Sequence, residues 1–259
     1  MVSLDEILKV THERVERAKS SLPPDELQKR CQNSPPVRSF QKALITSPTI
    51  ALIGEIKKAS PSAGLIREDF SPLKLAKIYL ENGARALSVL TEEKFFQGKL
   101  DYLLKIRGKI ELPLLRKDFI IDEYQVFESR FFGADAILLI VSVLSDEKIN
   151  RLFRLARESG MEVIVEIHSE EDWRRISSLP AKLIGINNRN LKTLTTDLST
   201  TFKLAPFISK NQVVISESGI KTREDVLNLE KAGVKGILVG ETIMGSRDAA
   251  QKIRYLLGK

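Results

Sequence analysis

Eight short apolar runs alternate with amphipathic segments from about residue 50 to the C-terminus. The runs lie at 50–57, 85–90, 112–117, 135–141, 161–167, 182–187, 212–217 and 235–240. Short continuous runs of this kind are typical of parallel strands, because helices cover both faces of a parallel sheet. The spacing of apolar residues in the segments between them is typical of helices. The pattern therefore predicts strands and helices in strict alternation.

Signals for helix starts and ends punctuate this alternation. Start signals are found at Ser71-Pro72, Ser145-Asp146, Ser169-Glu170 and Thr222 followed by Asp225. Glycines placed just before a strand are Gly83, Gly133, Gly160 and Gly233. Eight units of roughly 25 residues predict a closed (β/α)8 (TIM) barrel at 49–259, since such barrels need ~250 residues. An open doubly wound sheet is the alternative, although no glycine-rich phosphate fingerprint follows the first strand.

The first 48 residues precede this repeat. Apolar residues at helical spacing predict an amphipathic helix over the first twenty: Leu4, Ile7, Leu8, Val15 and Ala18. Residues 21–48 contain five prolines and predict an irregular connection. We expect residues 1–48 to be an extension within the same domain, with the helix over or beside the barrel mouth.

Composition narrows the possible functions. The net charge is +7 and the pI about 9.4, but basic and acidic residues are interleaved, which favours solvated helix faces over a nucleic-acid surface. The single cysteine, Cys31, excludes an internal disulfide and is typical of a reducing compartment. No metal-binding spacing occurs, and the longest apolar run, 136–141, is too short to cross a bilayer. We therefore expect a cytoplasmic, monomeric protein that binds neither metal, nucleic acid nor membrane.

Charged and polar residues gather where the predicted strands end. They are Glu55 and Lys57 (strand 1), Lys117 (strand 3), Glu166 (strand 5), Asn187 and Arg189 (strand 6), and Glu217 and Ser218 (strand 7). A single charge at a strand end is often only a solvated terminus. Five strands ending this way point to chemistry, because barrel active sites form at the carboxyl ends of strands. Arg116 and Lys58 have the opposite parity and should face the helices.

A phosphate site is also predicted at this end. Ser218-Gly219 and Gly240-Glu241-Thr242 follow strands 7 and 8, where barrels commonly bind phosphate through backbone amides. Lys57 would add a positive charge, whereas only the backbone of Glu241 suits an anion. The alternative is that Gly219 and Gly240 merely permit tight turns.

Six motifs resemble the indole-3-glycerol phosphate synthase family across essentially the whole chain. They are E-I-K-K-A-S-P-S (55–62), L-R-K-D-F (115–119), E-I-H (166–168), I-G-I-N-N-R-N-L (184–191), S-E-S-G-I (216–220) and L-V-G-E-T-I-M (238–244). The resemblance implies a cofactor-independent enzyme of tryptophan biosynthesis. Its reaction would be the ring closure, decarboxylation and dehydration of 1-(2-carboxyphenylamino)-1-deoxyribulose 5-phosphate, an anionic small molecule.

The resemblance also implies residue roles. Lys117 would be the acid for ring closure, Glu166 would take a proton during dehydration, and either Lys57 or Lys117 would help hydroxide leave. Glu55 would orient Lys57, and Asn187 and Glu217 would hold sugar hydroxyls or the lysines. Arg189 would meet an anionic group, Ser60 and Ser218 would hydrogen-bond the ligand, and an apolar slot for the aromatic ring would use Phe96, Phe119, Leu138, Leu194 and Val239. Leu138 and Val239 would equally suit plain core.

Two other functions compete with this interpretation. Another phosphosugar barrel, such as an aminoaldose isomerase, typically works with an Asp or Cys acid–base pair, whereas this chain pairs lysines on strands 1 and 3. A nucleic-acid-binding scaffold would need clustered basic and aromatic residues, but aromatic residues make up only 6% of the chain.

Overall fold

A closed barrel of eight parallel strands forms the body of the protein. The computed structural model describes residues 2–259. Going around the barrel, the strands follow the order β1-β10-β9-β8-β7-β6-β5-β4. They span Ala51–Ile56 (β1), Ala86–Leu90 (β4), Leu114–Lys117 (β5), Ala136–Ile140 (β6), Glu162–Ile167 (β7), Leu183–Asn187 (β8), Val213–Glu217 (β9) and Gly236–Val239 (β10). The predicted (β/α)8 barrel is confirmed, each strand lying within two residues of its predicted limits, and the open sheet is wrong.

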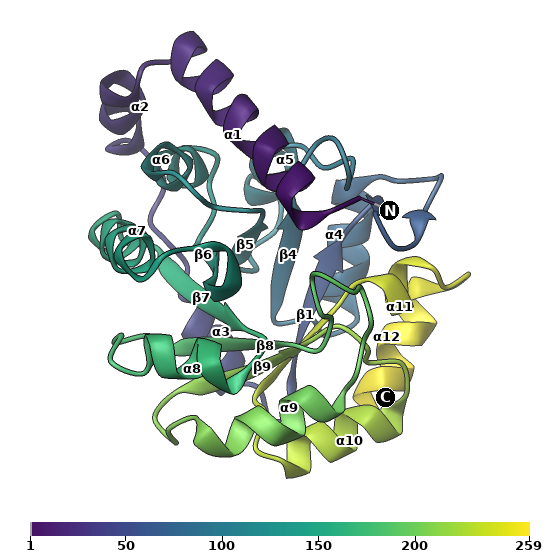
Figure 1. Cartoon of the computed structure of the whole chain (residues 1–259). Helices are drawn as coiled ribbons and strands as arrows, with labels where there is room; N and C mark the ends of the chain where they lie inside the picture. Colours follow the sequence, from purple (N-terminus) through teal and green to yellow (C-terminus); the bar gives the residue numbers. More distant parts are fainter. Residues whose placement is uncertain (1) are drawn as a thin grey trace.

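Helices surround the barrel (Figure 1). They are α4 (Pro72–Glu81), α5 (Asp101–Arg107), α6 (Glu123–Phe131), α7 (Asp146–Glu158), α8 (Glu170–Ile176), α9 (Ser199–Leu204), α10 (Arg223–Lys231), α11 (Glu241–Met244) and α12 (Ala249–Leu257), with 3₁₀ turns η1 (Val141–Val143) and η2 (Ala205–Phe207). Ser145, Ser169 and Thr222 accept N-cap hydrogen bonds as expected, whereas Ser71 does not. The four glycines before strands have φ between 79° and 96°, a conformation that costs glycine little.

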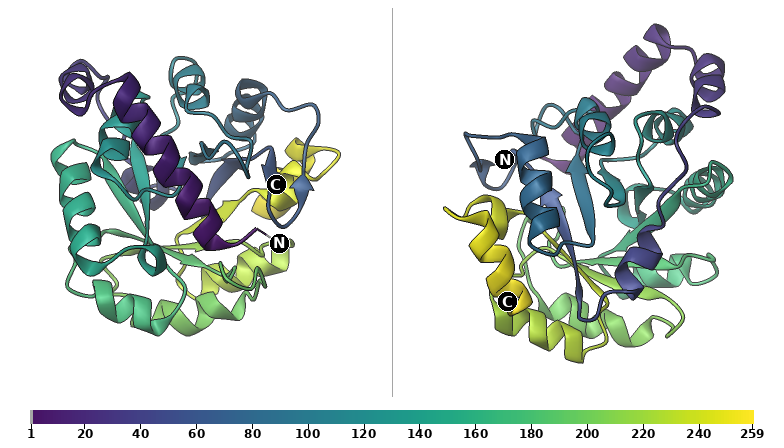
Figure 2. Two further views of the ribbon diagram at one scale, coloured as in Figure 1. Left: turned by 45° about the horizontal axis from the view of Figure 1, so that its top comes forward. Right: turned by 180° about the vertical axis from the view of Figure 1, so that it is seen from behind.

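The N-terminal extension is more helical than its prolines suggested. α1 (Leu4–Ser21) matches the predicted helix, but α2 (Pro24–Cys31) and α3 (Phe40–Ile45) occupy the predicted irregular connection. Pro24 is the first residue of α2, where a missing N–H costs nothing, and Ser39 caps α3. Figure 2 shows α1 crossing the open end of the barrel.

The hydrophobic core has an inner and an outer layer. Inside the barrel, Ile53, Leu115 and Ile164 belong to one buried cluster that also contains Phe40 and Leu44 of α3. α3 contacts β1, β4 and β9, and it closes the barrel at the amino ends of the strands. The outer layer fills the space between strands and helices. The site must therefore lie at the opposite end, where the strands finish.

A small hairpin in the loop after β1 was not predicted. β2 (Ala59–Ser60) pairs with β3 (Gly64–Leu65) in antiparallel register, and Gly64 takes a φ of 65°. Two-residue strands are too short to leave a periodic pattern in the sequence. The hairpin places Ser60 and Ser62 at the barrel mouth.

Candidate active site

A cavity of about 740 Å³ opens at the carboxyl ends of the strands. This volume is within the usual range for small-molecule sites. All seventeen residues predicted for the site line it: Glu55, Lys57, Ser60, Phe96, Lys117, Phe119, Leu138, Glu166, Asn187, Arg189, Leu194, Glu217, Ser218, Gly219, Val239, Gly240 and Glu241. The prediction that strand-end charges share one cavity is confirmed. Lining the cavity does not by itself assign a role to any of these residues.

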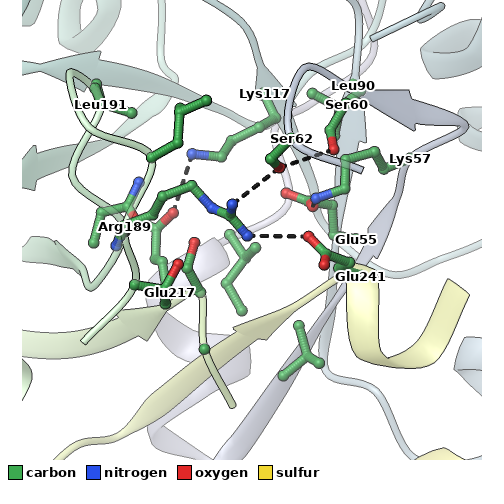
Figure 3. A pocket seen from close by; sticks show the side chains of 18 of the residues that line it. Glu55, Lys57, Ser60, Ser62, Leu90, Lys117, Arg189, Leu191, Glu217 and Glu241 are labelled. Atoms are coloured by element: carbon green, nitrogen blue, oxygen red, sulfur yellow. Dashed lines mark hydrogen bonds and ion pairs between the residues drawn. The ribbon is translucent and has the colours of Figure 1, made fainter. Parts of the chain in front are cut away.

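Lys117 lies between two buried carboxylates. Its Nζ is 2.8 Å from Glu166 Oε2 and 3.1 Å from Glu217 Oε2. Both glutamate side chains are 1% exposed, so water screens these charges little. Strand alternation explains the convergence, because β5, β7 and β9 each direct their last inward residue to the same place. Figure 3 shows the Lys117 side chain pointing toward Glu217, with a dashed line marking the ion pair between them.

This packing shifts the protonation of all three groups. Burial alone would lower the pKa of Lys117, but Glu166 and Glu217 raise it well above its ordinary value. Burial alone would raise the pKa of Glu166, but Lys117 and His168 hold it well below its usual range. Burial raises the pKa of Glu217 to about 7, with Glu166 adding to the effect and Lys117 opposing it. Near neutral pH the site therefore contains an ammonium, a firmly ionised carboxylate and a carboxyl that titrates.

A second ion pair lies at the end of β1. Lys57 Nζ is 2.8 Å from Glu55 Oε1, as the two-residue spacing predicted. The backbone of Gly240, after β10, comes so close that a Cβ there would lie 2.2 Å from Glu55 Oε1. Gly240 is therefore required for close approach and not only for a turn.

Arg189 joins three loops at the rim (Figure 3). Its Nη1 donates to Ser62 Oγ at 2.9 Å, and its Nη2 lies 3.0 Å from Glu241 Oε2. Its backbone N–H donates to Asn187 Oδ1, while Asn187 Nδ2 donates to Glu166 Oε1 at 3.1 Å. The Glu241 carboxylate, which the sequence marked as unsuitable beside a phosphate, is thus paired with a guanidinium.

Apolar side chains line another part of the cavity. The rings of Phe96 and Phe119 are 6.5 Å apart and tilted by 46°. Glu92, which the sequence did not single out, accepts backbone hydrogen bonds from residues 94, 95 and 96 and so shapes the loop carrying Phe96. Leu138 lies beside these rings in the inner core cluster and also lines the cavity, so it serves both purposes.

The N-terminal helix lies over part of the mouth. Leu4 and Ile7 line the cavity. Arg14 fastens the helix, since its Nη2 is 2.8 Å from Asp118 Oδ2 and its Nη1 donates to the carbonyl of Thr91. Burial would raise the pKa of Asp118, but Arg14 and Arg116 hold it below its ordinary value.

Arg116 faces the surrounding helices, as its parity predicted. Its guanidinium lies 2.9 Å from Asp118 and 2.8 Å from Glu128 of α6. It is fully buried and does not line the cavity. Lys58, the other residue assigned to that side, does not line the cavity either.

The end of β9 is held by a residue that the sequence did not predict. Asn188 Nδ2 donates to the carbonyls of Glu217 and Ser218, and its Oδ1 accepts from Thr201. Ser218 and Gly219 both have positive φ, at 67° and 83°. The double asparagine in the N-N-R motif was the available signal, because alternate parity sends Asn188 outward when Asn187 points inward.

No helix within residues 2–259 is long and apolar enough to cross a membrane.

Solved structures with this fold include 3-hexulose-6-phosphate synthase from Salmonella typhimurium (TM-score 0.64, 15% identity, 80% of this chain and 96% of that one). A tryptophan synthase α-subunit from Pyrococcus furiosus is similar (TM-score 0.63, 17% identity, 82% and 99%). At these identities the likeness concerns the fold alone.

Sequence comparison identifies the family. The family model for indole-3-glycerol phosphate synthase matches residues 4–256. The indole-3-glycerol phosphate synthase of Acetivibrio thermocellus is 54% identical over 200 residues, 77% of each chain. Those of Dehalococcoides mccartyi strain CBDB1 (47% identity, 94% of this chain and 95% of the relative) and Rhodopirellula baltica (43%, 99% and 99%) match nearly end to end. This chain therefore belongs to the indole-3-glycerol phosphate synthase family, carboxy-lyases of tryptophan biosynthesis.

Proposed function

We propose that the Lys117–Glu166–Glu217 cluster and the Lys57–Glu55 pair carry out the family's reaction by general acid–base catalysis. The observation that carries this proposal is the position of Lys117 Nζ, 2.8 Å and 3.1 Å from two buried carboxylates in the wall of the cavity. The lysine is kept protonated and Glu166 ionised, so one cluster contains both an acid and a base.

Ring closure comes first. The ring carbon that bears the carboxylate attacks the ketone carbon of the substrate, and the ketone oxygen becomes an alkoxide. Lys117 donates a proton to this oxygen, which neutralises the charge as it develops. The bond from the ring carbon to the carboxylate then breaks, carbon dioxide leaves, and the electron pair restores the aromatic ring.

Dehydration follows. Glu166 removes the ring proton while the hydroxyl formed in the first step leaves as water, protonated by Lys57 or Lys117. Asn187 holds one oxygen of Glu166, and Glu55 orients Lys57. Glu217 positions the Lys117 ammonium from the other side.

The rest of the cavity binds the substrate. Backbone amides near Gly219, Gly240 and Glu241 receive the phosphate, helped by Lys57, since this region of a barrel commonly binds phosphate. Phe96, Phe119, Leu138, Leu194 and Val239 surround the aromatic ring. Arg189 exchanges part of its pairing with Glu241 for an anionic group of the substrate, and Ser60 and Ser218 hydrogen-bond the ligand.

The extension and the barrel act as one domain in a monomeric, cytoplasmic enzyme. Asp135, fully buried at the start of β6, supports the single domain, because it accepts from the backbone N–H of Arg38 and pairs with Arg107. The single cysteine suits a reducing compartment. Sedimentation of the purified protein at micromolar concentration would test the monomer.

Fluorescence-monitored turnover tests the catalytic proposal. Purified protein is mixed with the carboxyphenylamino substrate, without added metal or nucleotide, and indole formation is followed. Lys117→Ala should abolish turnover, whereas Lys105→Ala, at an exposed lysine on α5, should leave it unchanged. Thermal unfolding checks that the variant is folded, since removing one partner of a buried pair costs about 3–5 kcal/mol unless the carboxylates take up protons. Near-wild-type indole production by the Lys117 variant would remove this lysine from the mechanism.

A further inference from the structure

A largely buried histidine lies next to the proposed base, on the side away from the cavity. His168 follows β7 in the chain, and its side chain is 12% exposed but does not line the cavity. Its Nε2 is 3.2 Å from Glu166 Oε1, and its Nδ1 is 3.8 Å from Asp172 Oδ2. The imidazole ring therefore lies between two carboxylates, one of which faces the cavity and one of which does not.

The surroundings favour the protonated ring. Among residues 2–259, neither ring nitrogen has a hydrogen-bond partner of good geometry, so the charges around the ring decide its protonation. An imidazolium is attracted by both carboxylates. Burial alone would lower the pKa of His168, but Glu166 and Asp172 outweigh burial and the opposing charge of Lys117, and the net shift is upward.

The backbone holds this arrangement in place. The N–H of His168 donates to Asp172 Oδ2 at 2.8 Å, and the N–H of Asp172 donates to Ser169 Oγ at 3.1 Å. Ser169 is the N-cap of α8, so Asp172 is fixed in the first turn of that helix. The Asp172 carboxylate is thereby held beside the ring, with its Oδ2 3.8 Å from His168 Nδ1.

We propose that His168 is a positioning residue for Glu166: as an imidazolium fixed by Asp172, it orients the Glu166 carboxylate and weakens its affinity for protons. Lys117 holds one carboxylate oxygen, while Asn187 and His168 approach the other. Removing the imidazolium removes one of two cations, so Glu166 should bind a proton at higher pH. The catalytic consequence rests on the role of Glu166 proposed above.

Histidine NMR tests the contact without reference to catalysis. The chain contains only two histidines, and the other, His12, is exposed on α1 and serves as an internal reference. In uniformly histidine-labelled protein, Glu166→Gln should lower the titration midpoint of His168 by about one pH unit or more and leave that of His12 unchanged. An unchanged midpoint for His168 would overturn the proposal.

The pH dependence of kcat tests the consequence. In His168→Gln, whose side-chain amide offers an N–H donor but no charge, the loss of kcat toward low pH should begin about one unit higher than in wild type, with KM little changed. His168→Ala should show the same shift with a lower maximum, because it also loses the contact. His12→Gln is the matched control and should follow the wild-type profile.

The outcomes separate this inference from the proposed function. A profile for His168→Gln that coincides with wild type along the whole acid limb, down to the lowest pH at which both proteins remain folded, would overturn the positioning role. Wild-type turnover by Glu166→Gln would instead overturn the role of Glu166 in the reaction, even with the NMR coupling intact. A uniform loss of kcat at every pH, with no shift of the profile, would assign His168 a purely structural role and also overturn the inference.

Discussion

Gly240→Ala should disable the Lys57–Glu55 pair without altering any charged residue. A Cβ at this position would lie 2.2 Å from Glu55 Oε1, 2.9 Å from its Cδ and 3.0 Å from its Cβ. Contacts this short are repulsive, so the Glu55 side chain must move by roughly 1 Å. Its Oε1 is the atom that contacts Lys57 Nζ at 2.8 Å, and a shift of that size takes the pair beyond hydrogen-bonding distance.

The size of the effect follows from the interaction lost. A hydrogen bond to a charged group contributes about 1.5–3 kcal/mol, which corresponds to roughly 10- to 100-fold in rate. We therefore expect kcat/KM of Gly240→Ala to fall by about 10- to 100-fold. Initial rates of indole formation over a range of substrate concentrations measure the change, and thermal unfolding reports any loss of fold.

Gly108→Ala is the matched control. Gly108 follows α5 with a negative φ, and a Cβ there would meet only the carbonyl oxygen of Leu104, at 3.8 Å. This variant should keep wild-type activity. A folded Gly240→Ala enzyme with kcat/KM within about twofold of wild type would refute the reasoning, because the pair would then be dispensable or able to re-form.

Three further predictions concern the base, the helix and the titrating carboxyl. Glu166→Gln should slow product formation far more than it weakens ligand binding, as single-turnover rates and equilibrium titration would show, because the amide cannot accept the proton. Arg14→Met should lower the free energy of unfolding by about 1–3 kcal/mol in urea titrations and expose α1 to proteolysis, since the buried carboxylate of Asp118 loses a partner. The folded pKa of Glu217, about 7, lies above its ordinary 4.5, so ionisation of Glu217 destabilises the fold as pH rises from 4.5 to 7. We compare the free energy of unfolding of Glu217→Gln with that of wild type at each pH. The difference should favour the variant by up to about 3 kcal/mol more at pH 8 than at pH 5, as measured by unfolding at both.

Each of these has an outcome that contradicts it. Equal losses of rate and affinity in Glu166→Gln would indicate a positioning role. Arg17→Ala, at an exposed arginine on α1, is the control for Arg14→Met. Equal effects of the two substitutions would show that the contact with Asp118 does not stabilise the fold. A stability difference for Glu217→Gln that does not depend on pH would show that the carboxyl does not titrate near neutrality.

The barrel and most of its charged lining could be predicted because they follow from regular geometry. Once eight strands are parallel, alternation decides that Lys117, Glu166 and Glu217 point inward and Arg116 outward, whatever the loops do. The prediction of an irregular connection over residues 21–48 was wrong because it treated proline only as a helix breaker. Proline is equally suited to the first position of a helix, which Pro24 occupies in α2.

The unpredicted parts depend on irregular backbone. The Glu92 carboxylate shapes its loop because it accepts hydrogen bonds from three backbone amides. Ser62 reaches Arg189 because a short hairpin places it there. The pairing of Arg189 with Glu241 joins residues 52 positions apart through two loops. Such contacts leave no periodic trace, so only coordinates reveal them.

Lys117 and Asp118 are consecutive residues at the end of β5 whose side chains point in opposite directions. This arrangement couples helix α1 to the chemistry. Lys117 faces the reacting groups, and its immediate successor holds the helix that covers them. A trimmed barrel that lacked the extension would leave Asp118 without its Arg14 partner, with Arg116 as its remaining ion pair, one peptide bond from the proposed acid. Shortening the enzyme to its eight repeats would thus be a change to the catalytic centre.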